Sequence, residues 1–288
     1  TVNNYRTLLS PNSYTLNLAH YDGGNITPNG QSVSLTKSVI SENPVHITSV
    51  IESGAHRIGY LMYNGFYPQY ESALNHAFAE LKSAGVTELV LDLRYNSGGS
   101  IATATRLASM ITGQFSGQVF AKEQWNAKIE SYYNRQGLSN RFYNLFTTTL
   151  ANGESIQSMR LNKIWILTSK ATASASELVI NGLKPYIQVI QIGDATVGKN
   201  VGSITLYDSP NFSKTGANTK HKYAMQPLVL KVVNKEGFGD YINGLEPNFE
   251  YKENLGQMGI LGQADEPLLE KAIQNIVGTG RSSHRPRK

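Results

Sequence analysis

Apolar residues follow two different spacings along the chain, and stretches of the two kinds alternate. Short apolar runs bounded by polar turns predict strands, and apolar residues three and four positions apart predict amphipathic helices. The predicted strands cover residues 14–21, 32–39, 57–64, 88–93, 163–168, 188–192, 203–207 and 225–233. The predicted helices cover residues 70–84, 101–111, 177–183 and 267–277. This alternation favours an α/β fold in which helices cover parallel strands.

Residues 113–160 differ from the rest of the chain because aromatic side chains lie there among polar ones. Helical stretches are predicted around residues 122–135 and 139–150. We favour a small helical subdomain with its own aromatic core. The alternative is a lid whose aromatic side chains grip an apolar peptide end, and the two interpretations are compatible.

Length and charge limit the classes of function. The 288 residues allow one large domain or two modest ones. The formal net charge is +5, but four of the 26 basic residues lie in the last eight positions, and the other 22 nearly balance the 21 acidic residues. The charge therefore reports a basic tail, residues 281–288, which we expect to be disordered. We expect no nucleic-acid partner.

The chain contains no cysteine, which excludes a thiol protease, disulfides and cysteine-rich zinc sites. The histidines show no metal-ligand spacing, and no glycine-rich phosphate loop occurs, so we expect no metal and no cofactor. No run of 18 apolar residues appears. Because the chain starts at Thr1, we expect it to be processed or trimmed, and membrane association only through a preceding region.

Ser174 occupies the turn between a predicted strand and a predicted helix. The stretch Thr172–Glu177 follows strand 163–168, and a hydroxyl placed there lies beside unpaired backbone N–H groups at the positive end of the helix dipole. A nucleophile needs this setting. Ser174 and Glu177 also have the spacing of a capping box, so this stretch alone favours a helix cap.

Two further stretches change that balance. Lys199 ends a glycine-containing loop after strand 188–192, and a desolvated lysine can act as a base if its pKa falls well below about 10.4. Gly98 and Gly99 follow strand 88–93, and a glycine pair lets backbone N–H groups approach a substrate carbonyl. Taken alone, the glycine pair favours an ordinary strand-to-helix turn.

Together, residues 91–99, 172–177 and 193–199 resemble the motifs of the C-terminal processing proteases, which are S41-type serine peptidases. The resemblance extends from about residue 57 to residue 278. It implies a crotonase-like α/β core with a helical insertion. It also implies a peptidase core over residues 56–280, preceded by an N-terminal β segment, residues 1–55, that is a remnant of, or a linker from, a PDZ domain.

The resemblance also assigns roles to single residues. Ser174 is the implied nucleophile, and Lys199, 25 residues later, is the implied base. The implied oxyanion donors are Gly99, with help from Gly98, and Ala175. Ser203 stands where many members of the family carry a glutamine that orients the lysine. Two alternatives follow: the serine takes that role with a shorter reach, or the catalytic set has no third member.

The implied activity is cleavage of proteins near apolar C-termini, in the periplasm or cell envelope of a bacterium. The alternative is a non-proteolytic ligand- or peptide-binding protein on the same fold, because the superfamily also holds retinoid-binding modules and acyl-CoA enzymes. The intact pair of Ser174 and Lys199 argues against this alternative.

Overall fold

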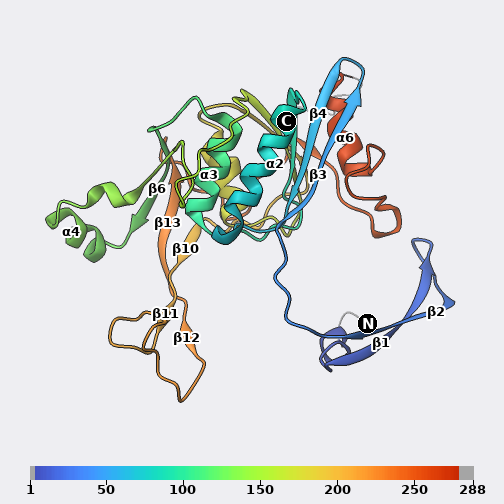
Figure 1. The fold of residues 1–288 in the computed structure, drawn as a ribbon, viewed down its shortest axis with the longest axis horizontal. Coiled ribbons are helices and arrows are strands. Elements are labelled where there is room, and N and C mark those ends of the chain that lie inside the picture. The colour runs from blue at the N-terminus through green and yellow to red at the C-terminus, as the bar shows by residue number, and fades with distance from the viewer. Residues whose placement is uncertain (1–3, 279–288) are drawn as a thin grey trace, which may run out of the picture.

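A six-stranded sheet carries the alternating part of the chain (Figure 1). In spatial order its strands are β14 (Phe249–Glu250), β9 (Gln188–Gly193), β8 (Lys163–Thr168), β5 (Glu88–Asp92), β4 (His56–Tyr63) and β3 (Val45–Ser53). All neighbouring pairs are parallel except β3 with β4. The computed structural model, which describes residues 4–278, thus confirms the predicted α/β fold with a largely parallel sheet.

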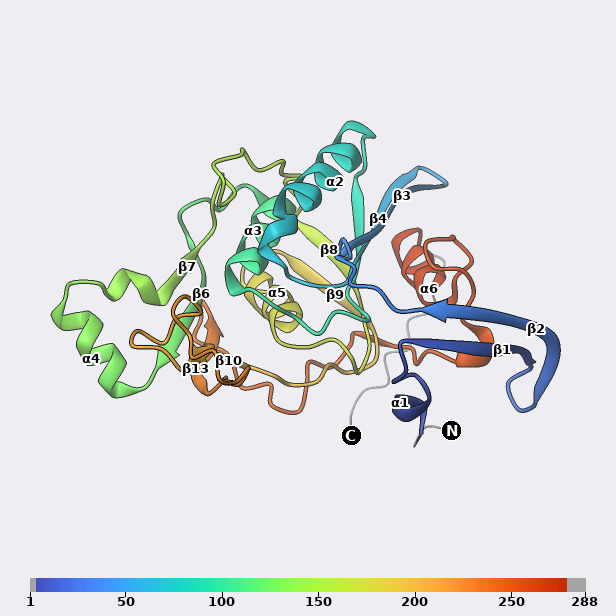
Figure 2. The same cartoon turned by 60° about the horizontal axis from the view of Figure 1, so that its bottom comes forward.

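Helices cover both faces of this sheet (Figure 2). On one face lie α2 (Glu71–Ser83), α3 (Ile101–Thr112) and α5 (Ala175–Leu183), and on the other lies α6 (Pro267–Ile276). Successive side chains of a strand point to opposite faces, so Leu89 and Leu91 of β5 join the core under the three helices, whereas Val90 packs with α6. None of the helices within residues 4–278 is long and apolar enough to cross a membrane.

A second, antiparallel sheet packs beyond α3 and α5 (Figure 2). In spatial order its strands are β10 (Val201–Ser203), β13 (Leu228–Asn234), β6 (Val119–Trp125) and β7 (Tyr143–Leu145). A short extension of this sheet, formed by β11 (Leu206–Tyr207) and β12 (Ala224–Met225), projects away from the body (Figure 1). The predicted strands 203–207 and 225–233 are therefore each divided. A register shift at Ser203 and the missing N–H of Pro227 mark the breaks.

The segment 113–160 is less helical than predicted. Only α4 (Ala127–Arg135) and the 3-10 turn η2 (Ser139–Phe142) are helical, and residues 119–125 form a strand instead. That strand pairs with β13, about a hundred residues away, and such tertiary pairing overrides the local pattern. Tyr132, Tyr133 and Phe142 contact one another, but only Phe142 of the three is buried, so they do not form a separate core. Phe120 and Phe146 belong to the main core, where Tyr186 contacts Phe146.

The N-terminal segment contains the short helix α1 (Tyr5–Leu8) and a hairpin of β1 (Ser13–Tyr21) and β2 (Ile26–Thr36). The turn falls at residues 22–25 as predicted, but the second strand begins earlier than residue 32. Nearly every hairpin residue is exposed, so the predicted half-burial of the first strand is wrong. Strand β3 is part of the main sheet, although residue 56 was the predicted start of the core. The predicted tail, 281–288, lies outside the described residues.

Two single-turn 3-10 helices complete the fold: η1 (Pro68–Tyr70) precedes α2, and η3 (Leu255–Gln257) lies between β14 and α6.

Candidate active site

The three sequence motifs meet because each follows one of three adjacent parallel strands. Gly98 and Gly99 come after β5, Ser174 after β8 and Lys199 after β9, and these strands are neighbours in the sheet. The carboxyl ends of parallel strands lie at the same edge, where α/β proteins commonly bind ligands. The topology therefore brings together residues that are up to 101 positions apart.

A cavity of about 590 Å³ lies at this edge, between the first turns of α3 and α5 and the second sheet. Its volume is within the usual range for small-ligand and substrate sites. Five of the six predicted site residues line it: Gly99, Ser174, Ala175, Lys199 and Ser203. Gly98 lies directly behind them, because a Cβ at that position would fall 2.7 Å from the Cβ of Ser174.

Ser174 begins α5 in a strained conformation, with φ 57° and ψ −114°. Positive φ is uncommon in residues other than glycine and costs roughly 1–3 kcal/mol. The surrounding hydrogen bonds hold it there. The N–H of Ala173 donates to the Asn96 carbonyl oxygen over 3.1 Å, and the N–H of Ser174 donates to Glu177 Oε2 over 2.8 Å. Backbone strain of this kind is found at functional sites where the fold supports it.

Two backbone N–H groups beside Ser174 are available to a ligand. Among the described residues, neither Gly99 nor Ala175 donates its N–H to a protein acceptor. The N–H of Gly98, in contrast, already donates to Asn96 Oδ1 over 2.9 Å. The predicted help from Gly98 as a donor is therefore not available, and its missing side chain is what gives Ser174 and Ala175 room.

Lys199 lines the cavity together with Ser174, but it is more exposed than the sequence predicts for a desolvated base. The residue is exposed, and within residues 4–278 its ammonium group makes no hydrogen bond or ion pair, including to Ser174. Lys199 lies on the loop between β9 and β10. Ser203 is also exposed, and its hydroxyl forms no hydrogen bond with Lys199.

Glu177 joins the nucleophile turn to the lysine loop. Its Oε2 accepts from the N–H groups of Ser174 (2.8 Å) and Lys199 (2.9 Å). Its Oε1 accepts from the N–H of Gly198 (2.6 Å) and the hydroxyl of Thr196 (2.5 Å). The carboxylate is fully buried. The sequence indicated only a helix cap, and no local pattern could have revealed partners 19–22 positions away on another loop.

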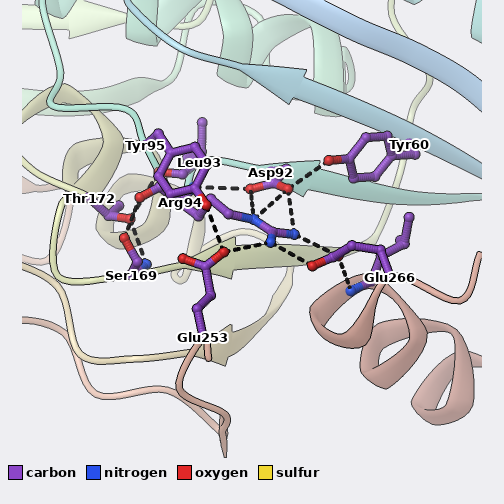
Figure 3. Close-up of polar contacts among 10 residues, drawn as sticks. Tyr60, Asp92, Leu93, Arg94, Tyr95, Ser169, Thr172, Glu253 and Glu266 are labelled. Atoms are coloured by element: carbon purple, nitrogen blue, oxygen red, sulfur yellow. Dashed lines mark hydrogen bonds and ion pairs between the residues drawn. The ribbon is translucent and has the colours of Figure 1, made fainter. Parts of the chain in front are cut away.

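A second polar network surrounds the buried side chain of Arg94, which follows strand β5 (Figure 3). The guanidinium of Arg94 forms ion pairs with Asp92, Glu253 and Glu266, and the hydroxyl of Tyr60 donates to Asp92 over 2.7 Å. Burial raises the pKa of Asp92, although Arg94 opposes this. Burial also tends to raise the pKa of Glu266, but hydrogen bonds from Arg94 outweigh it and lower the pKa overall.

This network supports the loop that precedes Ser174. The hydroxyl of Thr172 donates to the Leu93 carbonyl oxygen over 2.9 Å, and the hydroxyl of Ser169 donates to the Arg94 carbonyl oxygen (Figure 3). Loop 169–172 is thus attached to the end of β5. Sequence reasoning missed Arg94 and its partners because Glu253 and Glu266 are 159 and 172 positions away. Among residues 4–278, no cluster of acidic and histidine side chains could hold a metal ion.

Comparison with known proteins places this site in a family. The family model described as peptidase family S41 matches residues 57–223, more than half of the chain. The chain belongs to peptidase family S41. All the predicted site residues fall inside the matched region.

Two similar curated relatives come from photosynthetic organisms. The carboxyl-terminal-processing protease of Picosynechococcus sp. is 25% identical over 234 residues, which cover 78% of this chain and 50% of the relative. The chloroplastic C-terminal processing peptidase of Tetradesmus obliquus is 28% identical over 182 residues, or 60% of this chain and 35% of the relative. This S41 chain thus spans half or less of the length of these relatives.

Solved structures agree on the fold. A Bacteroides fragilis crystal structure assigned to the S41 proteases matches with a TM-score of 0.79 and 26% identity, covering 98% of this chain and 71% of that one. The photosystem II D1 C-terminal processing protease matches with a TM-score of 0.54 and 19% identity, over 83% of this chain and 57% of that one. The second likeness is evidence for the fold alone.

Proposed function

We propose that this S41 chain is a serine peptidase that cuts proteins near their C-termini, with Ser174 as nucleophile and Lys199 as base. One observation carries the proposal: Ser174 begins a helix in a strained conformation inside one cavity with a lysine and two unpaired N–H groups. The names of the curated relatives, which are processing proteases and peptidases, support the reaction and its location at C-termini.

The proposed reaction uses residues of this chain only. Lys199 Nζ takes the proton of the Ser174 hydroxyl, and Oγ attacks the scissile carbonyl carbon. The N–H groups of Gly99 and Ala175 stabilise the oxyanion, each contributing a factor of about 10²–10³. The C–N bond breaks as Lys199 returns the proton to the leaving amine. Lys199 then activates a water molecule, which releases the acyl group from Ser174.

Lys199 must lose its proton before it can act, and we propose that the substrate brings this about. A peptide in the cavity would exclude water from the lysine, and desolvation disfavours the charged ammonium. Ser203 lines the same cavity and is our candidate for orienting Lys199 at that stage. Ser203→Ala should therefore lower turnover by roughly 10-fold, far less than Lys199→Ala. Ser203→Gln should keep turnover near that of the parent chain, because the glutamine can orient Lys199 in place of the serine.

We propose protein or peptide substrates with apolar C-termini, as in the family that the three motifs resemble. We also propose the crotonase-like subclass of α/β fold, a division into an N-terminal segment, a peptidase core and a tail, and a location in the periplasm or cell envelope of a bacterium. These finer assignments rest on the resemblance of the three motifs.

A digest followed by mass spectrometry tests the central proposal. A denatured protein with an apolar C-terminal tail would be incubated with the chain and with its Ser174→Ala and Lys199→Ala variants. We expect cuts near the tail from the parent chain and none from either folded variant. Full activity in the Ser174→Ala variant would refute the assignment.

The exposed position of Lys199, without a hydrogen bond to Ser174, favours one other candidate function, a peptide-binding protein without proteolysis. A serine-reactive phosphonate separates the two. Labelling of Ser174 would support the peptidase. A folded chain that binds tail peptides but takes up no label up to about pH 10, near the unperturbed pKa of lysine, would support the binding protein.

A further inference from the structure

The cavity beside Ser174 has a chemically distinct corner. Strand β6 contributes Glu123 and Trp125, two positions apart and therefore on the same face of the strand, and both line the cavity. Opposite them in the β6–β13 ladder stand Val232 and Leu230. One wall thus presents a carboxylate and an aromatic ring next to aliphatic side chains.

Glu123 is held in place but is not neutralised. Asn144 Nδ2 donates to its Oε1 over 2.9 Å, and Trp125 Nε1 donates to its Oε2 over 3.2 Å. A carboxylate has about four acceptor positions, so two remain free. Within residues 4–278 no basic side chain forms an ion pair with Glu123. The carboxylate is therefore oriented for a donor that the described residues do not provide.

The charges that line the cavity indicate the charge of the substrate group that would pair with Glu123. Among the described lining residues, only Glu123 and Lys199 are charged. The proposed mechanism requires Lys199 to be neutral when it removes the proton from Ser174. At that moment Glu123 is the one charge in the cavity, and a partly desolvated carboxylate favours a cation beside it.

We propose that this corner accepts a lysine or arginine side chain of the substrate, on the residue that contributes the scissile carbonyl. The aliphatic stem would lie on Leu178, Leu230 and Val232, and the cationic head would reach Glu123 with Trp125 beside it. Long basic side chains bury their stems and pair their heads in this manner, and an indole ring adds a cation–π contact. In the proposed mechanism the scissile carbonyl binds between the N–H groups of Gly99 and Ala175, which line the same cavity as Glu123. The substrate residue that carries this carbonyl therefore lies next to the corner.

This inference rests on the proposed peptidase function and refines it: the tail is apolar, and one basic residue precedes the cut. The test uses matched tail peptides that carry lysine or its uncharged analogue norleucine at that position. We expect the parent chain to cleave the lysine peptide with a kcat/KM roughly 10- to 100-fold higher, as for a hydrogen bond to a charged group. Equal rates for the two peptides would overturn the assignment. A basic preference on the leaving side of the cut would overturn it as well.

Glu123→Gln keeps the size of the side chain and removes its charge. The variant should lose the preference for lysine, so that its kcat/KM values for the lysine and norleucine peptides become equal. Circular dichroism shows that it is folded. The matched control is Glu236→Gln, which removes the same charge from an exposed position outside the cavity. It should retain the full preference.

Peptide binding to the Ser174→Ala variant, measured by fluorescence anisotropy, separates the two proposals. If the parent chain cleaves neither peptide but Ser174→Ala binds the lysine peptide more tightly than the norleucine peptide, the peptidase proposal fails and the basic corner stands. If cleavage occurs without discrimination in rate or binding, the basic corner fails and the peptidase stands.

Discussion

Replacing Glu177 with glutamine tests whether the buried carboxylate holds the site together. Four donors converge on that carboxylate, two on each oxygen: the N–H groups of Ser174 and Lys199, and the N–H of Gly198 with the hydroxyl of Thr196. A glutamine keeps one oxygen and presents an NH₂ group in place of the other. Two of the four donors would then face another donor.

The magnitude follows from the number of bonds lost. Hydrogen bonds to a charged group contribute about 1.5–3 kcal/mol each, so losing two lowers the free energy of unfolding by roughly 3–6 kcal/mol. At roughly 2–4 °C per kcal/mol for a large domain, this loss corresponds to a fall in Tm of roughly 6–20 °C. The Ser174 and Lys199 backbones would also move apart, and a displacement of about 1 Å in an active site can cost about 10²-fold in rate.

Thermal unfolding followed by circular dichroism gives the Tm, and turnover of a tail peptide well below that temperature gives the rate. The control is Glu236→Gln, which removes the same charge from an exposed side chain and should change stability by less than about 0.5 kcal/mol. If Glu177→Gln melts within a degree of the control and keeps full turnover, Glu177 does not have this role.

Three further substitutions test other parts of the structure. Gly99→Ala would force φ 141° on alanine and bring its Cβ too close to the carbonyl oxygen of Phe66. We expect a lower Tm. We also expect a serine-reactive probe to acylate Ser174 at least roughly 10²-fold more slowly. Glu266→Gln should lower the free energy of unfolding most above pH 4.5, because Arg94 lowers the pKa of Glu266 from that value in the folded state. Denaturant titrations should show that the difference in stability between variant and parent shrinks as the pH falls. A difference that stays constant with pH would contradict this. Phe120→Ala empties a fully buried site and should lower the free energy of unfolding by about 3–5 kcal/mol, measured in urea; a loss below about 1 kcal/mol would show that Phe120 is not part of the core.

Elements built on local pattern were predictable. The strand 163–168 has the predicted limits, and the last helix begins at residue 267 as predicted and ends one residue early, at Ile276. Both were predictable because the spacing of their apolar residues is a local feature of the sequence. Strand β6 was not predictable as a strand, because its partner β13 is remote and nothing in residues 119–125 identifies it. The exposed hairpin shows the converse, since the alternating pattern predicted two strands but neither their pairing nor their exposure to solvent.

The candidate site divides in the same way. By itself the sequence determined that Ser174, Lys199 and the glycine pair each follow a buried strand. The resemblance of the three motifs to the S41-type peptidases then indicated which of these residues could carry the chemistry. Only the tertiary structure decided that Gly98 N–H is already occupied and that Lys199 is exposed. Hydrogen-bond partners and solvent exposure depend on residues brought together from distant parts of the chain, and local spacing carries no information about them.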